Sequence, residues 1–146
     1  MSGFRTLAPT VQAALFAAIA SRLPATAMCS LGYPAGGLSD QQVWVVGDFD
    51  SQVAWATTGW TQRGEEGSTE VRVAVLQTTA TFTDPQAQAL VLAGCVEDAI
   101  AADHTLGGVV DRAEVAAIKG QEAIPDEHQR QYGVTLTVSW AGEVAA

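Results

Sequence analysis

Residues 132–141 alternate between apolar and polar side chains, and this pattern constrains the fold more than any other part of the sequence. The apolar side chains stand at every second position: Val134, Leu136, Val138 and Trp140. The polar ones stand between them: Thr135, Thr137 and Ser139. A strand with this period buries one face against a core and leaves the other face in water. The chain therefore has to cover one face of a sheet with helices, which predicts an α+β fold.

The remaining elements follow from the same reasoning. Strands are expected at residues 43–46, 52–60, 69–79 and 109–118. A first helix is expected between Pro9 and Pro24, with apolar residues at every fourth position from Val11. The second begins at Asp84-Pro85, an N-cap acid followed by proline, and ends at Gly107-Gly108. The order α-β-β-β-α-β-β places two helices on one mostly antiparallel sheet of about five strands.

A polar segment at residues 62–67 predicts the tip of a projecting hairpin, because it is rich in charge and glycine. Trp60 precedes it among threonines. An aromatic side chain there could anchor a protein partner or fold back onto its own sheet, and the sequence leaves both open. The candidate subunit or partner contacts are Trp60, Gln62, Arg63, Glu65 and Glu66.

Length and charge limit the classes of function. The 146 residues are enough for one domain, spanning residues 1–146. The 16 acids outnumber the seven Lys and Arg residues, which argues against a protein that grips nucleic acid through its phosphates. Residues 1–39 carry two arginines and no acid, so the excess lies in residues 40–146. Two ends of different charge could associate head to tail, or the first helix could simply be buried.

The N-terminal segment superficially resembles a secretory signal, but Arg22 and Met28 interrupt the pattern before Cys29, so a mature helix is expected. We expect no membrane span, since no uninterrupted apolar run reaches about 18 residues.

Signals for chemistry are weak throughout the chain. Cys29 and Cys95 are 66 positions apart and form no metal or redox motif. His104 stands at a helix end and His128 in a polar stretch, with no shared motif. The Asp48/Asp50 pair lacks the further ligands of a calcium loop. We therefore expect no metal site, no cofactor and no enzymatic activity.

Several segments together resemble the tail terminator (tail completion) proteins of long-tailed bacteriophages and related gene transfer agents. The most specific segment is Asp-x-Thr-Leu-Gly-Gly-Val-Val at residues 103–110. Weaker agreement covers nearly the whole chain, through Gly32-Tyr33-Pro34, Val45-Val46-Gly47, the Arg63/Glu65/Glu66 segment, residues 70–75 and residues 109–112. The sequence departs from the commoner form at Gly64, and Gly67-Ser-Thr stands where an aromatic or bulky apolar residue is frequent.

The resemblance implies a structural virion protein of the tail neck, made in the host cytoplasm. Such a protein forms a ring, typically a hexamer, that caps the tail tube, ends its polymerisation and meets the head-completion (stopper) protein. Acids facing the lumen would let DNA pass without specific binding; the candidates are Asp48, Asp50, Glu65 and Glu66. The alternatives are another neck component (stopper or adaptor) or a tail tube protein. A small cytosolic enzyme or ligand-binding domain using Cys29 or Asp48/Asp50 is the remaining alternative.

Overall fold

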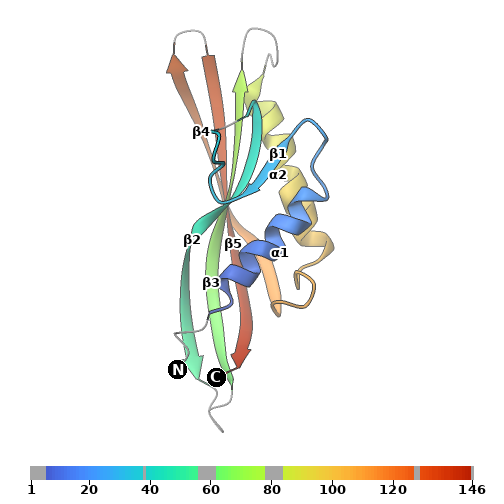
Figure 1. The fold of residues 1–146 in the computed structure, drawn as a ribbon, viewed down its shortest axis with the longest axis vertical. Coiled ribbons are helices and arrows are strands. Elements are labelled where there is room, and N and C mark those ends of the chain that lie inside the picture. The colour runs from blue at the N-terminus through green and yellow to red at the C-terminus, as the bar shows by residue number, and fades with distance from the viewer. Residues whose placement is uncertain (1–5, 38, 56–61, 78–83, 127–128, 146) are drawn as a thin grey trace.

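The structure, a computed structural model, describes residues 6–37, 39–55, 62–77, 84–126 and 129–145. In chain order the elements are α1 (Ala8–Ala20), β1 (Met28–Leu31), β2 (Gln41–Trp55), β3 (Gln62–Gln77), α2 (Pro85–Ala102), β4 (Arg112–Asp126) and β5 (Gln129–Ala145). They form a single five-stranded sheet in the order β1-β2-β3-β5-β4 (Figure 1). β1 runs parallel to β2 and every other pair is antiparallel. The predicted α+β class and order of elements are confirmed.

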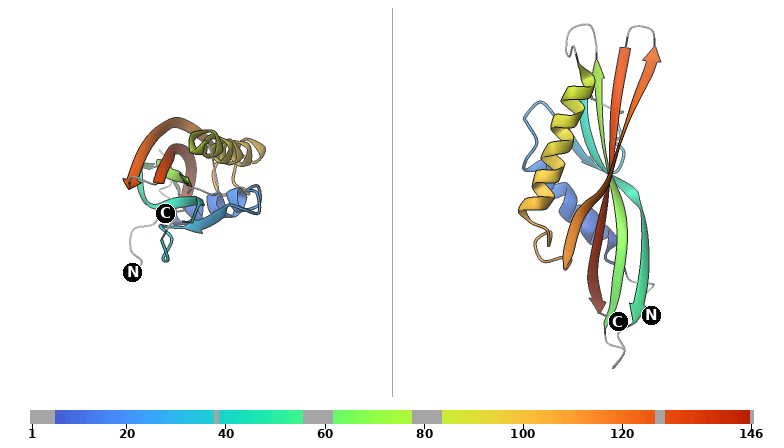
Figure 2. Two further views of the ribbon diagram at one scale, coloured as in Figure 1. Left: turned by 90° about the horizontal axis from the view of Figure 1, so that it is seen from above. Right: turned by 180° about the vertical axis from the view of Figure 1, so that it is seen from behind.

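Both helices lie on the same side of a strongly twisted sheet of long strands (Figures 1 and 2). The core fills the space between the two layers. From α1 it takes Val11, Leu15 and Ile19, all fully buried at the predicted four-residue spacing. From the sheet it takes alternate residues, including Val134, Leu136, Val138 and Trp140 as the sequence pattern predicted. The other face of the sheet carries no helix among the described residues, and we call it the open face.

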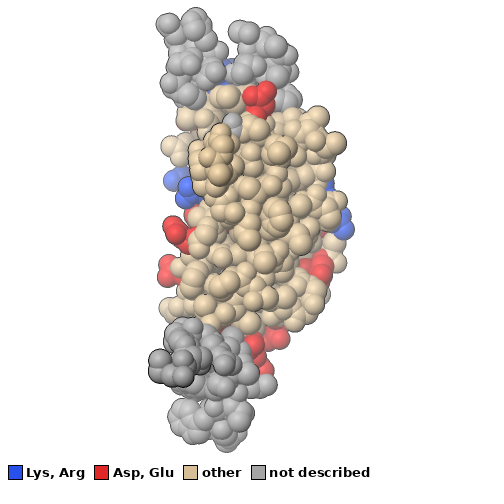
Figure 3. All heavy atoms as spheres, in the orientation of Figure 1, with Lys and Arg blue, Asp and Glu red and all other residues tan. Residues whose placement is uncertain are grey.

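The side of the molecule on which α1 and β1 lie is nearly free of charge. In Figure 3, Lys, Arg, Asp and Glu side chains stand at its margins, and other side chains cover its middle. The sequence explains this, because Arg22 is the one charged residue between positions 6 and 37. The charge excess of the chain therefore lies outside this surface.

The predicted strand boundaries were wrong throughout the sheet: β3 begins at Gln62 and not at residue 69, and β4 ends at Asp126 and not at residue 118. Residues 43–46 and 52–60 were expected as separate strands, whereas β2 runs continuously from Gln41 to Trp55. Its pairing with β3 is interrupted between Val45 and Phe49, so Gly47 and Asp48 lie in a bulge and not in a turn. The four residues of β1 were not among the expected strands; they pair in register with Gln42–Val45.

The predicted hairpin tip at residues 62–67 was also wrong. These residues belong to β3, and residues 63–67 pair on both sides, so that Glu65 lies opposite Val53 of β2 and Gly142 of β5. Residue 60, the tryptophan expected on the hairpin, lies outside the described residues. The polar composition of residues 62–67 reflects the open face and two long-range contacts of Glu65 and Gly67, which are described below.

Helix α2 begins as predicted. The Asp84 carboxylate accepts a hydrogen bond from the Ala87 backbone N–H at 3.1 Å, with Pro85 at the start of the helix. Helix α1 begins at Ala8 and so includes Pro9, which was expected to lie before it; its N-cap Leu7 offers no side-chain acceptor. A carboxylate from the sheet, Glu65, supplies that acceptor instead.

The segment that carries the most specific family resemblance is a tight turn after α2. Asp103 ends the helix, and its carboxylate accepts hydrogen bonds from the Thr105 hydroxyl at 3.0 Å and the Gly107 backbone N–H at 2.8 Å. Leu106, Gly107 and Gly108 all have positive φ, of 50°, 72° and 89°. Leu106 adopts this positive φ, which is uncommon for a residue other than glycine, because burial of its side chain in the core holds it in place. The motif therefore makes a structural turn between α2 and β4.

The Asp103 carboxylate gives a pH-dependent prediction. The Thr105 hydroxyl and then the Gly107 N–H hold the pKa of Asp103 below its ordinary value of 3.8. Since the folded pKa is depressed, the turn keeps both bonds at neutral pH and loses them only as pH falls through that lowered value. In an NMR titration we expect the Gly107 amide shift to change with a midpoint below 3.8. Asp103→Asn should remove this transition, and a midpoint at or above the ordinary value would contradict the assignment.

Candidate functional site

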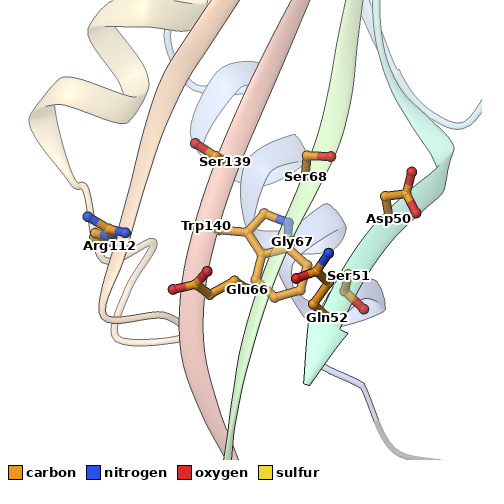
Figure 4. Close-up of a pocket in the computed structure, with 9 residues that line it drawn as sticks. All are labelled: Asp50, Ser51, Gln52, Glu66, Gly67, Ser68, Arg112, Ser139 and Trp140. Carbon is orange, nitrogen blue, oxygen red and sulfur yellow. The ribbon is translucent and has the colours of Figure 1, made fainter. Parts of the chain in front are cut away.

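An open pocket of about 460 Å³ lies on the open face, where β2, β3, β5 and the start of β4 run side by side. Its lining residues are Asp50, Ser51, Gln52, Glu66, Gly67, Ser68, Arg112, Ser139 and Trp140 (Figure 4). Strand register brings them together. Gln52, Glu66, Ala141 and Arg112 form one row across β2, β3, β5 and β4. Asp50, Ser68, Ser139 and Glu114 form a second row on the same face.

Trp140 and Gly67 form the floor of this pocket. The Trp140 ring is 2% exposed, and its Nε1–H donates to the Thr69 Oγ1 at 3.4 Å. A Cβ atom on Gly67 would lie 2.4 Å from the Trp140 Cζ2 and 2.8 Å from the Asp50 carbonyl oxygen. The indole of Trp140 therefore occupies the space that a side chain at residue 67 would need.

Charges of opposite sign stand at the two margins of the pocket. Asp50 lies on β2 at one side, and Arg112 lies on β4 at the other (Figure 4). Glu66 points from β3 toward the Arg112 side. The residue between Glu66 and Arg112 in the row is Ala141, whose small side chain leaves the pocket open.

The open face continues beyond this pocket as a surface of mixed charge. A second hollow of about 310 Å³ is lined by Glu70, Arg72, Lys119, Gln121, Gly133 and Thr135. Arg72 forms an exposed ion pair with Glu70 at 3.0 Å. Such exposed pairs contribute little to stability. Around these two hollows the open face is polar and carries charges of both signs.

The structure separates the four predicted lumen acids. Asp50 and Glu66 share the pocket, and Asp48 is exposed in the β2 bulge. Glu65 points to the helix side and is 1% exposed, so its prediction as a hairpin-tip or lumen charge was wrong. Its carboxylate accepts hydrogen bonds from the Thr6 hydroxyl and from the Leu7 backbone N–H, the latter at 2.7 Å. Gln62 and Arg63 begin β3, and the predicted roles of their side chains stay predictions.

The residues considered for chemistry do not gather at the pocket. Burial raises the pKa of Cys29 to about 11, so its thiol is a poor nucleophile at neutral pH. Cys95 is half-buried in α2, and His104 is exposed in the turn that follows it. In the described part of the chain, no group of three or more His, Cys, Asp and Glu side chains could hold a metal ion. Neither of the two described helices is long and apolar enough to cross a bilayer.

No protein-family model and no curated protein sequence matches the chain. Among solved structures, it is similar to a chain from the virion of a native gene transfer agent particle. The TM-score is 0.58, the identity is 17%, and the match covers 95% of this chain and 100% of the other. The chain shares its fold with a protein of that virion. At this identity the likeness shows the fold, which extends over nearly the whole chain.

Sequence reasoning missed Arg112, Trp140 and the serines as parts of one site. Asp50 and Glu66 were singled out as candidate lumen acids, with Glu66 also a candidate partner contact. The signal that unites them is strand register, since residues 50, 66, 112 and 140 become neighbours only when β2 pairs with β3, β3 with β5 and β5 with β4. The sequence alone gives no such register for strands of 15 to 17 residues.

Proposed function

We propose that this protein is a structural component of a phage or gene transfer agent virion that closes as a ring on the end of the tail tube. There it ends tube polymerisation and presents a surface to the head-completion protein. The observation that carries the proposal is the fold shared over 95% of the chain with a protein of a gene transfer agent virion. The Asp103–Gly108 turn supports it, because the residues of the resemblance also make the distinctive left-handed backbone after α2.

The site supports an assembly role better than catalysis. The pocket on the open face joins carboxylates, serines and one arginine, and neither cysteine nor His104 lines it. Among the described residues, its serines therefore have no histidine beside them that could act as a general base. We assign Asp48, Asp50 and Glu66 to the channel side of the ring, where carboxylates would repel the phosphates of passing DNA. Trp60, Gln62, Arg63 and Glu66 are the proposed contacts to neighbouring subunits or to the tube.

Tube growth measured in vitro tests this function. Tail tube protein from the same particle is polymerised with and without this protein, and tube length is followed by negative-stain electron microscopy. We expect tubes to stop growing at about one ring per tube end, with extra density at one end. The matched control is the same amount of the protein unfolded by heat.

The other outcomes separate the alternatives. If the protein alone forms open-ended tubes, it is a tube protein. If it leaves tube growth unchanged but binds the head-completion protein, it is another neck component. Particle assembly that survives alanine at Asp48 and at Cys29 would count against the enzyme or ligand-binding alternative.

A further inference from the structure

The sheet has an unpaired edge at each of its two sides. Among the described residues β1 pairs with Gln42–Val45 only, so the outer edge of β2 has no strand partner after Val45. The Gln12 side chain binds the carbonyl oxygens of Val46 and Gly47, which leaves residues 48–55 as the free part of that edge. In the same described part, β4 pairs with β5 alone, so its outer edge is also unpaired. Free N–H and C=O groups of such edges are ready to pair with another strand.

The two edges are complementary in charge on the open face. The free part of β2 carries Asp50, and the start of β4 carries Arg112, at opposite margins of the pocket (Figure 4). Strands β3 and β5 lie between the two margins within one copy. In two copies placed edge to edge, the acid of one would meet the base of the other.

The same edges are complementary in shape on the helix side. Phe49 pairs in register with Thr69, whose hydroxyl binds the buried Trp140, so Phe49 points to the helix side, where it is 45% exposed. Next to the start of β4 is a hollow of about 220 Å³ between that strand and the end of α2. Its apolar lining is Ile100, Ala101, Ala113 and Val115. A cavity of about 150 Å³ holds a benzene molecule, so a phenyl ring fits in this hollow.

We propose that the β2 edge of one copy adds to the start of β4 of a second copy. Phe49 of the first copy then enters the hollow beside Ala113 and Val115, and Asp50 lies next to Arg112 of the second. The contact uses a different surface on each copy, so repetition gives either a closed ring or an open fibre. The contact is inferred from the charge and shape of the two strand edges alone. Its closure into a ring rests on the function proposed above.

Features of β4 limit the contact to a short segment. The register of β4 shifts after Val115, and Lys119 follows on the open face. Bulges and edge lysines are devices that prevent unspecific pairing of edge strands. Only Arg112–Val115 is therefore a regular docking edge. The chain carries nine excess negative charges, so a contact that joins an acid to a base also avoids repulsion between copies.

Disulfide trapping tests the contact directly. In a variant with Cys29 and Cys95 replaced by serine, Asp50→Cys and Arg112→Cys are introduced together. Within one copy these positions are separated by three strand spacings of about 4.8 Å, roughly 14 Å. A disulfide needs Cα atoms within about 7 Å, so any bond must join two copies. The matched control is Asp50→Cys with Lys119→Cys, on the same strand and face but beyond the bulge.

On a non-reducing gel after mild oxidation, we expect a ladder of disulfide-linked oligomers. The cross-linked fraction should be at least tenfold larger for Asp50→Cys with Arg112→Cys than for the control, and reduction should remove the ladder. No ladder, or one of equal strength in the control, overturns the contact. A ladder that stops at a defined ring number supports the ring as well. An open-ended ladder keeps the contact but contradicts ring closure, and with it the tail-cap function.

Charge reversal gives a second measurement that needs no new cysteines. In the wild-type background, Asp50→Arg or Arg112→Asp alone should weaken self-association at least tenfold by analytical ultracentrifugation. The two together should restore it. Asp40→Arg, an exposed acid just before β2, is the control and should change it less than twofold. Wild-type protein that stays monomeric up to about 1 mM, or a double variant no better than the singles, overturns the inference.

Discussion

Gly67→Ala is expected to lower the free energy of unfolding by about 3 kcal/mol. The added Cβ would lie 2.4 Å from the Trp140 ring and 2.8 Å from the Asp50 carbonyl oxygen. The first neighbour is a buried indole and the second is backbone, so neither can move cheaply. Urea unfolding followed by circular dichroism measures the change. The expected loss of stability is near the upper end of the range for overpacked cores, because the Trp140 ring and strand β2 must both shift.

Gly47→Ala is the matched control for this change. Gly47 lies in the β2 bulge, and a Cβ there would meet nothing within 4 Å. Its substitution should change stability by no more than about 0.5 kcal/mol. Trp140→Leu combined with Gly67→Ala should cost less than the sum of the two single changes, since the clash is gone. A Gly67→Ala protein as stable as the Gly47→Ala protein would show that the indole does not require glycine here.

The parts of the fold that were predictable from sequence are those set by local periodicity. Alternation from Val134 to Trp140 placed one face of β5 in the core, and Asp84-Pro85 placed the start of α2, because both signals lie within a few residues. The resemblance carried by residues 103–110 pointed to phages and gene transfer agents, and a chain from a gene transfer agent virion has a similar fold. β1 has only four residues and stands beside glycine and proline, so its pairing with β2 has no local signal.

The error at residues 62–67 has a different physical cause. Polar residues and glycines usually mark a turn, and here they lie in the middle of a sheet. Gly67 is required by an indole 73 positions away in the chain. Glu65 is required by the start of α1, 58 positions away. Contacts between residues so far apart leave no local pattern in the sequence. Glu65 and Gly67 were therefore taken for turn residues, although Glu65 binds the start of α1 and Gly67 packs against Trp140 at the pocket floor.

Glu65→Ala is expected to lower the free energy of unfolding by about 3 kcal/mol. Glu65 supplies the acceptor that the N-cap residue Leu7 lacks, and its second oxygen binds the Thr6 hydroxyl. Alanine would leave the Leu7 N–H without this acceptor and open a space beneath the first turn of α1. Urea unfolding gives the total change, and hydrogen exchange of the α1 amides shows whether the loss begins at that helix.

Two comparisons show whether the carboxylate itself matters. Glu65→Gln keeps an acceptor for the Leu7 N–H and a similar shape, so it should cost only about 1 kcal/mol. Glu66→Ala changes the neighbouring, exposed acid and should stay within about 0.5 kcal/mol. Equal losses for Glu65→Ala and Glu66→Ala would contradict the anchoring role. Glu65 faces the helices and Glu66 faces the open face, so the two substitutions also distinguish two roles of the β3 carboxylates. Glu65 binds the start of α1, whereas Glu66 is exposed and is one of the proposed assembly contacts.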